Sequence, residues 1–169
     1  MVYSTWQRVG DDDQWSGEIV VPGVRMSSSP AAVVFQGKLY VFHERAEEVG
    51  WISMTVYDST TNSWSADQPV MGPHYPMQTS LGPAAIVLTE SDGAEVLYLF
   101  SEARGNQGTL LVASFDGFDW TPQLPARDVN GMPLRTRGRP GLAVLDGVIY
   151  CFREKREDLG KIYLSRASF

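Results

Sequence analysis

Apolar residues along the chain occur in short runs separated by glycine, proline and polar turns. The runs at 31–36 and 39–42 flank the turn Gln36-Gly37, and the second run ends in an apolar-Tyr-x-Phe pattern. Short runs rich in β-branched and aromatic residues, bounded by turn residues, are typical of antiparallel strands. No stretch of 11 or more residues has a helical period. The sequence therefore predicts an all-β protein.

This pattern occurs three times in the chain. Pro30, Pro83 and Pro140 each precede an apolar run, a turn and a second apolar run, and the tryptophans 15, 64 and 120 keep a similar spacing. Each unit contains four short strands, the fourth beginning at the tryptophan. We predict a single domain with repeats at approximately 23–70, 71–125 and 126–169, in which residues 1–22 complete a blade.

Four antiparallel strands per repeat, with the most apolar strand first, indicate the blades of a β-propeller. The segment Tyr57-Asp58-Ser59-Thr60-Thr61-Asn62-Ser63-Trp64 resembles a kelch repeat, and Ser114-Phe115-Asp116-Gly117-Phe118-Asp119-Trp120 resembles a degenerate sialidase Asp-box. The paired glycines of kelch units are replaced by His43-Glu44, Ser101-Glu102 and Arg153-Glu154. The resemblance implies a propeller of the kind that lectins also use.

The two ends of the chain carry complementary parts of a blade. Residues 161–169 read as a third strand without a fourth, whereas a fourth strand begins at Trp15 without a first or second. Two copies that complete each other would form a C2 homodimer with one six-bladed ring and no unpaired sheet edge. The rival interpretation is a fragment of a longer chain, with residues 1–9 belonging to a preceding blade.

Composition restricts the function classes. The chain has 169 residues, 43% of them hydrophobic, which is typical of a folded domain. A net charge of −6 opposes binding to a phosphate backbone, so we predict no nucleic-acid partner. Neither a signal peptide nor an apolar run of about 20 residues is present, so we predict no membrane insertion. Cys151 is the single cysteine and excludes an internal disulfide, whereas the compartment, cytoplasmic or secreted, stays open.

Charged and polar residues repeat on one face of the predicted propeller. The loops between second and third strands carry Glu44 with Arg45, Glu102 with Arg104, and Glu154 with Arg156. A long polar side chain lies five residues before each repeat proline, at Arg25, Gln78 and Arg135. A guanidinium beside a carboxylate suits the hydroxyl pairs of a sugar. The competing interpretation is that each pair ties its loop to the adjacent blade.

Other candidate residues lie in the loops between repeats. His74 and Tyr75 lie between two prolines and are placed to rim a pocket, although the same loop could be packed for shape alone. The tryptophans of the repeat are expected to wedge between blades, and the unrepeated Trp6 and Trp51 are candidates for stacking on sugars. Two histidines in the chain argue against a zinc site, so we predict no metal and no cofactor.

Repetition of the same polar groups is typical of a multivalent binder. We therefore predict a non-catalytic, carbohydrate-binding propeller that binds a glycan or glycoprotein and pairs with itself. Two alternatives are a kelch-like protein-interaction propeller and a sialidase-like glycoside hydrolase. Hydrolysis is disfavoured in this interpretation because each repeated glutamate lies beside an arginine, which lowers the pKa of a would-be acid.

Overall fold

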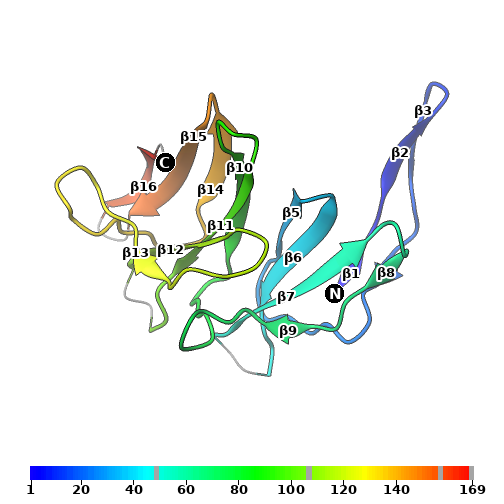
Figure 1. The fold of residues 1–169 in the computed structure, drawn as a ribbon, viewed down its shortest axis with the longest axis horizontal. Coiled ribbons are helices and arrows are strands. Elements are labelled where there is room, and N and C mark those ends of the chain that lie inside the picture. The colour runs from blue at the N-terminus through cyan, green and yellow to red at the C-terminus, as the bar shows by residue number, and fades with distance from the viewer. Residues whose placement is uncertain (48–49, 106–107, 156–157, 168–169) are drawn as a thin grey trace.

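The computed structural model describes residues 1–47, 50–105, 108–155 and 158–167 of the chain (Figure 1). These residues form β-strands joined by turns and loops, which confirms the all-β prediction. Successive antiparallel sheets are arranged side by side, each with its strands in the order of the sequence. The protein is a β-propeller, and each sheet of three or more strands is one blade. No helix able to cross a membrane occurs among the residues that the structure describes.

Blade 1 is a complete blade. It contains β5 (Ala31–Phe35), β6 (Lys38–Glu44) and β7 (Ile52–Asp58), and its fourth strand consists of two pieces, β8 (Ser63–Trp64) and β9 (Gln68–Pro69), that both pair with β7. The β5–β6 turn places Gln36 and Gly37 at φ 47° and 74°. Two successive positive φ values are those of the two-residue hairpin turns that match the strand twist, so the turn predicted at Gln36-Gly37 is confirmed.

Blades 2 and 3 repeat this order. Blade 2 contains β10 (Ala84–Thr89), β11 (Glu95–Glu102), β12 (Leu110–Phe115) and β13 (Leu124–Pro125). Blade 3 contains β14 (Gly141–Leu145), β15 (Val148–Lys155) and β16 (Asp158–Ala167), and in the described part of the chain it has three strands. The strand pairing aligns the blades residue by residue, since Glu44, Glu102 and Glu154 lie opposite Ile52, Leu110 and Ile162.

The N-terminal residues form the outer half of a further blade. The strand β1 (Val2–Tyr3) pairs with β4 (Ile19–Val20), and β2 (Trp6–Val9) pairs with β3 (Asp12–Trp15). Trp6 lies opposite Trp15 as Phe115 lies opposite Trp120. Residues 1–20 are therefore equivalent to a third and a fourth strand. The hairpin of residues 6–15, which we call the N-terminal arm, projects from the molecule (Figure 1).

Two hydrophobic clusters hold the blades together. The first junction, between blades 1 and 2, contains fully buried Phe42 and Leu97, with Trp120 packed against it. The second junction, between blades 2 and 3, contains Phe100 and Ile149. Trp120 thus confirms the predicted wedge, whereas the same prediction is wrong for Trp15, whose side chain is 71% exposed in the N-terminal arm.

Candidate functional site

The repeated glutamates share one backbone contact. Oε1 of Glu44, Glu102 and Glu154 accepts a hydrogen bond from the backbone N–H of the glycine six residues later, at 2.8, 3.0 and 2.7 Å. The glycines are Gly50, Gly108 and Gly160, all at positive φ. Each glutamate thus closes its own loop. The repetition of glutamate thus has a structural cause, a possibility that the sequence had left open.

A cleft lies on the loop face at the first junction. One part, about 460 Å³, is lined by the loop of residues 72–78, Arg104 and Gln123, among others. A second part, about 280 Å³, is lined by Glu44, Gly50, Thr79 and neighbouring residues, and also by Arg104. Because Arg104 lines both parts, we treat them as one feature and call it the interblade cleft.

Gln123 holds the wall of the interblade cleft. Its Nε2 donates to the carbonyl oxygen of Gln78 at 2.9 Å and to Oγ of Ser101 at 2.8 Å, and its Oε1 accepts from the Gln78 N–H at 2.8 Å. The 72–78 loop is therefore anchored to the segment just before β13 in blade 2. The sequence analysis did not identify Gln123 as a site residue. The one sequence signal for it is its position three residues after Trp120.

The groups inside the cleft are polar and partly free to contact a ligand. Tyr75 is 79% exposed, and its ring lies 6.4 Å from that of His74. The hydroxyl of Thr79 is fully buried, and no described residue forms a hydrogen bond with it. Arg104 lies across Gly50, where a Cβ atom would come within 2.9 Å of Nε. The glycine therefore makes room for the guanidinium.

The other predicted site residues occupy neighbouring junctions. Arg25 is exposed and pairs with Glu47 at 3.3 Å rather than with a repeated glutamate. Arg45 lines a separate cavity of about 560 Å³ with Trp64 and Asp67. The backbone carbonyl of Arg135 accepts a hydrogen bond from Arg153, and Arg156 lies outside the described residues. The structure thus brings together Glu44, His74, Tyr75, Gln78 and Arg104, whereas Glu102 is buried and does not line the cleft.

A buried histidine was also missed by the sequence analysis. The Nε2 atom of His43 lies 2.9 Å from Oδ1 of Asp67, and Nδ1 lies 3.2 Å from the carbonyl oxygen of Glu44. His43 and Asp67 occupy the places that Ser101 and Gln123 have in blade 2, so an imidazole–carboxylate contact replaces the amide link. Among the described residues, no three His, Cys, Asp or Glu side chains form a group able to hold a metal.

Comparison with known proteins supports the fold. Neither a protein-family model nor a curated protein sequence matches the chain. Solved structures similar to it include a GH43 enzyme from Xanthomonas citri complexed with xylotriose, with TM-score 0.60 and 20% identity over 99% of this chain and 62% of that one. A GH43 beta-xylosidase/alpha-arabinofuranosidase from a compost microbial metagenome has TM-score 0.56 and 14% identity, over 93% and 59%. The chain thus spans about three fifths of the length of these enzymes.

A lectin is also among the similar structures. The Aleuria aurantia lectin in complex with alpha-methyl-L-fucoside has TM-score 0.55 and 13% identity, over 99% of this chain and 51% of that one. The enzymes nevertheless have the higher scores, and this finding contradicts the prediction of a non-catalytic, lectin-like propeller that is not an enzyme. The physical reason for the error is that the repeated glutamates close loops, so their repetition does not indicate a multivalent binder. The resemblance to kelch and sialidase repeats stays a prediction.

Proposed function

We propose that the protein is a propeller of glycoside hydrolase type that takes short saccharides of xylose or arabinose in the interblade cleft. The observation that carries the proposal is the set of side chains that line this cleft, a carboxylate, a guanidinium, an amide and an exposed phenol. It is supported by the GH43 enzymes among the similar structures, two of which are complexed with xylotriose. Because the chain spans about three fifths of the length of those enzymes, the activity of the whole protein is part of the proposal.

The chemistry of the cleft suits a neutral sugar. The Arg104 guanidinium has donors in a planar arrangement that match neighbouring hydroxyl groups, and Gln78 lies within the same wall. The exposed ring of Tyr75 offers an apolar face on which a pyranose ring stacks, with a hydroxyl at its edge. The buried hydroxyl of Thr79 is available as a further donor or acceptor at the base of the cleft. A pentose oligosaccharide thus finds both stacking and hydrogen-bonding partners.

Hydrolysis needs carboxyl groups in defined places. Retaining and inverting glycosidases usually use two of them, about 5–5.5 Å apart or about 6.5–9.5 Å apart. Among the described residues, Glu44 is the one carboxylate that lines the interblade cleft. Its Oε1 accepts the Gly50 N–H, so in the proposal Oε2 carries the proton that passes to the glycosidic oxygen as the C–O bond breaks. In the proposal, the second carboxyl group that hydrolysis requires is supplied by the whole protein, outside the lining of this cleft.

The test combines hydrolysis with binding. The protein is incubated with xylotriose, nitrophenyl xyloside and nitrophenyl arabinofuranoside, and products are measured by chromatography while binding is measured by calorimetry. We expect Arg104→Ala and Tyr75→Ala each to weaken binding by about 10- to 100-fold, because one charged hydrogen bond or one stacked ring is lost. Arg8→Ala, in the N-terminal arm, is the control and leaves binding unchanged. Neither binding nor release with any of these saccharides would overturn the proposal.

The role of Glu44 has a matched control within the chain. Glu44→Gln keeps an acceptor for the Gly50 N–H, and Glu102→Gln makes the same change at the equivalent place, which does not line the cleft. We expect Glu44→Gln to lower turnover by at least about 100-fold and Glu102→Gln to leave it within about twofold. Equal loss in both variants would show that the glutamate acts only by closing the loop.

We also propose that two copies associate as a C2 homodimer that closes one propeller ring. The support is the incomplete blade at each end of the described chain, with the equivalents of a third and a fourth strand at residues 1–20 and three strands at residues 141–167. Sedimentation measures the mass directly. A mass of two chains is expected, and a mass of one chain, 18.7 kDa, at all concentrations contradicts this part of the proposal.

A further inference from the structure

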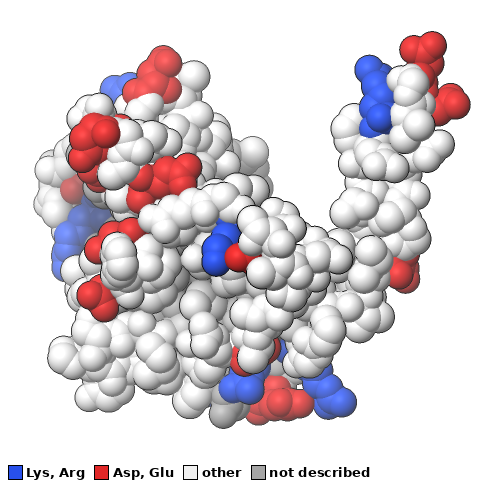
Figure 2. Space-filling model, turned by 45° about the vertical axis from the view of Figure 1, so that its right-hand side comes forward, with Lys and Arg blue, Asp and Glu red and all other residues white. Residues whose placement is uncertain are grey.

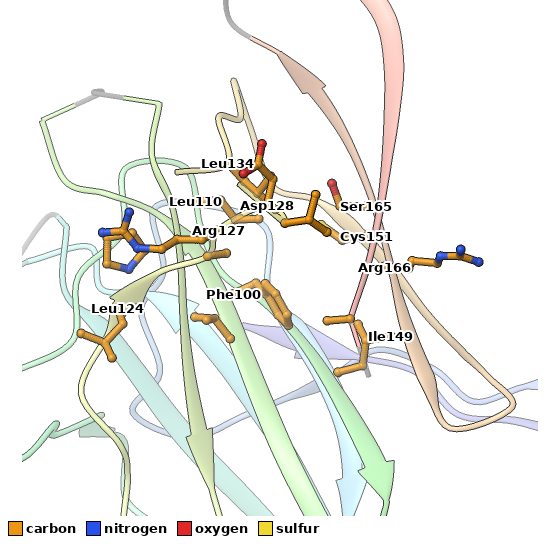
Figure 3. Close-up of a pocket in the computed structure, with 15 residues that line it drawn as sticks. Phe100, Leu110, Leu124, Arg127, Asp128, Leu134, Ile149, Cys151, Ser165 and Arg166 are labelled. Carbon is orange, nitrogen blue, oxygen red and sulfur yellow. The ribbon is translucent and has the colours of Figure 1, made fainter. Parts of the chain in front are cut away.

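An apolar cavity of about 550 Å³ opens at the second junction, between strands β11–β13 and β15–β16 (Figure 3). Phe100 and Leu110 line it from blade 2, and Ile149, Cys151 and Ala167 line it from blade 3. These residues belong to the core cluster or lie beside it, so the cavity continues the hydrophobic core to the surface. It is a place where a large apolar side chain would be buried.

At the first junction the equivalent space is filled by Trp120. Its ring stacks on Phe115 at 4.9 Å and meets Phe42 edge-on at 5.9 Å. The strand pairing makes Phe100 the equivalent of Phe42, and Ala167 the equivalent of Phe115. Both of these equivalents line the cavity. The cavity therefore has the position of a fourth-strand tryptophan of blade 3.

The outer edge of β16 lacks the corresponding cover. Ile52 and Leu110 are fully buried, whereas the equivalent Ile162 is 80% exposed. In blades 1 and 2 the cover comes from the chain after the fourth strand. Val70 donates to the carbonyl oxygen of Ile52 at 2.8 Å, and the Ile52 N–H donates to the carbonyl oxygen of Met77 at 2.9 Å. No strand pairs with this edge of β16 in the described part of the chain.

The N-terminal segment has the residues that make this cover. The Val21 N–H donates to the carbonyl oxygen of Met1 at 2.9 Å, and the Met1 amino group donates to the carbonyl oxygen of Val24 at 3.0 Å. This repeats the contacts of Val70 and Met77 with Ile52, so Met1 holds the place that Ile162 has in blade 3. Trp15, the tryptophan of this segment, is 71% exposed.

We propose that residues Trp15–Val24 of a second copy add to β16 as the fourth strand of blade 3, with Trp15 buried in the cavity. The register of the other blades places Ile19 opposite Leu164. Val21 and Val24 then cover Ile162, and residues 1–9 leave their present partners. The exchange breaks and forms the same kind of hydrogen bonds between backbones. The burial of Trp15 and Ile162 is therefore what favours it.

Exposure agrees with this exchange. The segment that is displaced buries little, since Val2, Trp6 and Val9 are about half exposed. The N-terminal arm carries acidic and basic side chains together near its tip (Figure 2), where Arg8 pairs with Asp13 at 3.4 Å. Arg127, Asp128 and Arg166 line the cavity, and the Arg166 side chain points away from it (Figure 3). Charge therefore does not decide the exchange, which rests on the equivalence of the strands and the exposure of Trp15 and Ile162.

The inference rests on the proposed association of two copies. Pairs of introduced cysteines distinguish strand exchange from association without exchange. In a Cys151→Ala background, Ile19→Cys is combined either with Leu164→Cys, its partner after exchange, or with Tyr3→Cys, its present partner. Under mild oxidation, we expect Ile19→Cys with Leu164→Cys to give a covalent dimer, and Tyr3→Cys with Ile19→Cys to give little internal disulfide. A dimer in which only the Tyr3–Ile19 pair closes, within one chain, overturns the exchange but leaves the association. A monomer rejects both.

The two exposed tryptophans of the arm provide a second, matched test. Trp15→Ala is expected to weaken association by at least 100-fold, because it empties the cavity. Trp6→Ala lies directly opposite in the same hairpin and is expected to change association by less than threefold. A synthetic peptide of residues 12–24 should dissociate the dimer of the parent protein, and in the Trp15→Ala variant, whose cavity is empty, it should slow alkylation of Cys151. Equal effects of the two variants, or unchanged Cys151 alkylation with the peptide bound, contradict the proposal.

Discussion

The two junctions of this propeller have similar inner strands and differ in what lies outside them. Phe42 at the first junction and Phe100 at the second occupy equivalent positions and are both buried. At the first junction Trp120 fills the space next to Phe42, whereas at the second a cavity of about 550 Å³ lies next to Phe100. The comparison teaches that the inner strands align the blades, and that the tryptophan of the fourth strand completes their packing.

The same contrast applies to the loop face. At the first junction, the 72–78 loop is tied to blade 2 through Gln123, and a polar cleft lies over it. At the second junction, Arg153 donates to the carbonyl oxygen of Arg135, as Gln123 donates to that of Gln78. One buried arginine thus takes over a contact that Gln123 makes in blade 2. The candidate site is best formed where the fourth strand is present.

The largest expected effect on stability comes from a substitution in the packed first junction. Phe42→Ala removes a fully buried ring that contacts Trp120, and we expect it to lower the free energy of unfolding by about 4 kcal/mol. In a Trp15→Ala background, where our proposal leaves the cavity empty, Phe100→Ala enlarges a space that is already open, so its loss should be about 2 kcal/mol. Urea denaturation followed by intrinsic fluorescence measures both. Equal losses would mean that the cavity is not empty in solution.

The next effect concerns the loop closures. Glu102 is 1% exposed, and Glu102→Ala leaves the buried Gly108 N–H without its acceptor, so we expect a loss of about 2 kcal/mol. Glu154 makes the same contact with Gly160 where solvent reaches the bond, and Glu154→Ala should cost about 0.5 kcal/mol. Thermal and urea unfolding of the two variants provide the comparison. A larger loss for Glu154→Ala would show that blade 3 is better covered in solution than in this structure.

Much of this fold could be predicted from the sequence because it rests on local patterns. The repeat prolines, the short apolar runs and turns such as Gln36-Gly37 each depend on a few neighbouring residues, and the structure has hairpins at Gln36-Gly37 and at the equivalent Asp146-Gly147. The wedge position of Trp120 follows from the same periodicity. By contrast, Trp15 carries the same signal but lies in an arm without an inner blade. Its environment depends on strands that the local pattern does not include.

The candidate site was predicted in composition but not in arrangement. Glu44, His74, Tyr75, Gln78 and Arg104 do meet at one junction. The roles of the glutamates could not be predicted. The spacing of a Glu and a Gly six residues later does not indicate a hydrogen bond between them until the loop geometry is known. Arg104 was expected to pair with Glu102, yet it lies across Gly50 of the preceding blade. Contacts between blades depend on how the blades pack, and the spacing of residues along the sequence does not predict that packing.

A smaller effect sharpens the comparison at the glycines. Gly50 and Gly160 occupy equivalent positions at φ 91° and 79°, so alanine at either should cost about 1–2 kcal/mol of backbone strain. At Gly50 the added Cβ also meets Arg104, whereas at Gly160 it meets no described atom within 4 Å. We therefore expect Gly50→Ala, but not Gly160→Ala, to weaken saccharide binding severalfold in calorimetry. Identical saccharide binding by both variants would show that Arg104 does not contribute to binding in the cleft.

The smallest effect compares equivalent turns in blades 1 and 2. Hydrogen bonds from Thr60 and the Lys38 ammonium hold the pKa of Asp58 well below its usual range. Backbone N–H groups of Asp119 and Phe118 lower the pKa of Asp116. Both carboxylates therefore stabilise the fold above the unfolded pKa of about 3.9, and this contribution is lost as the pH falls below it. We expect Asp58→Asn and Asp116→Asn to unfold more easily than the parent protein at pH 7, with the differences shrinking below pH 4.

Salt separates the two turns. Asp58 is stabilised partly by an exposed ion pair, in which Nζ of Lys38 lies 2.9 Å from Oδ2, and such pairs are screened by added ions. Asp116 accepts short-range backbone hydrogen bonds at 2.8 and 2.9 Å, which salt affects much less. In thermal unfolding at pH 7, 0.5 M NaCl should therefore reduce the destabilisation by Asp58→Asn and leave that by Asp116→Asn nearly constant. A parallel response of both variants would place the Asp58 effect in its contacts with Thr60, since those contacts resemble the ones in blade 2.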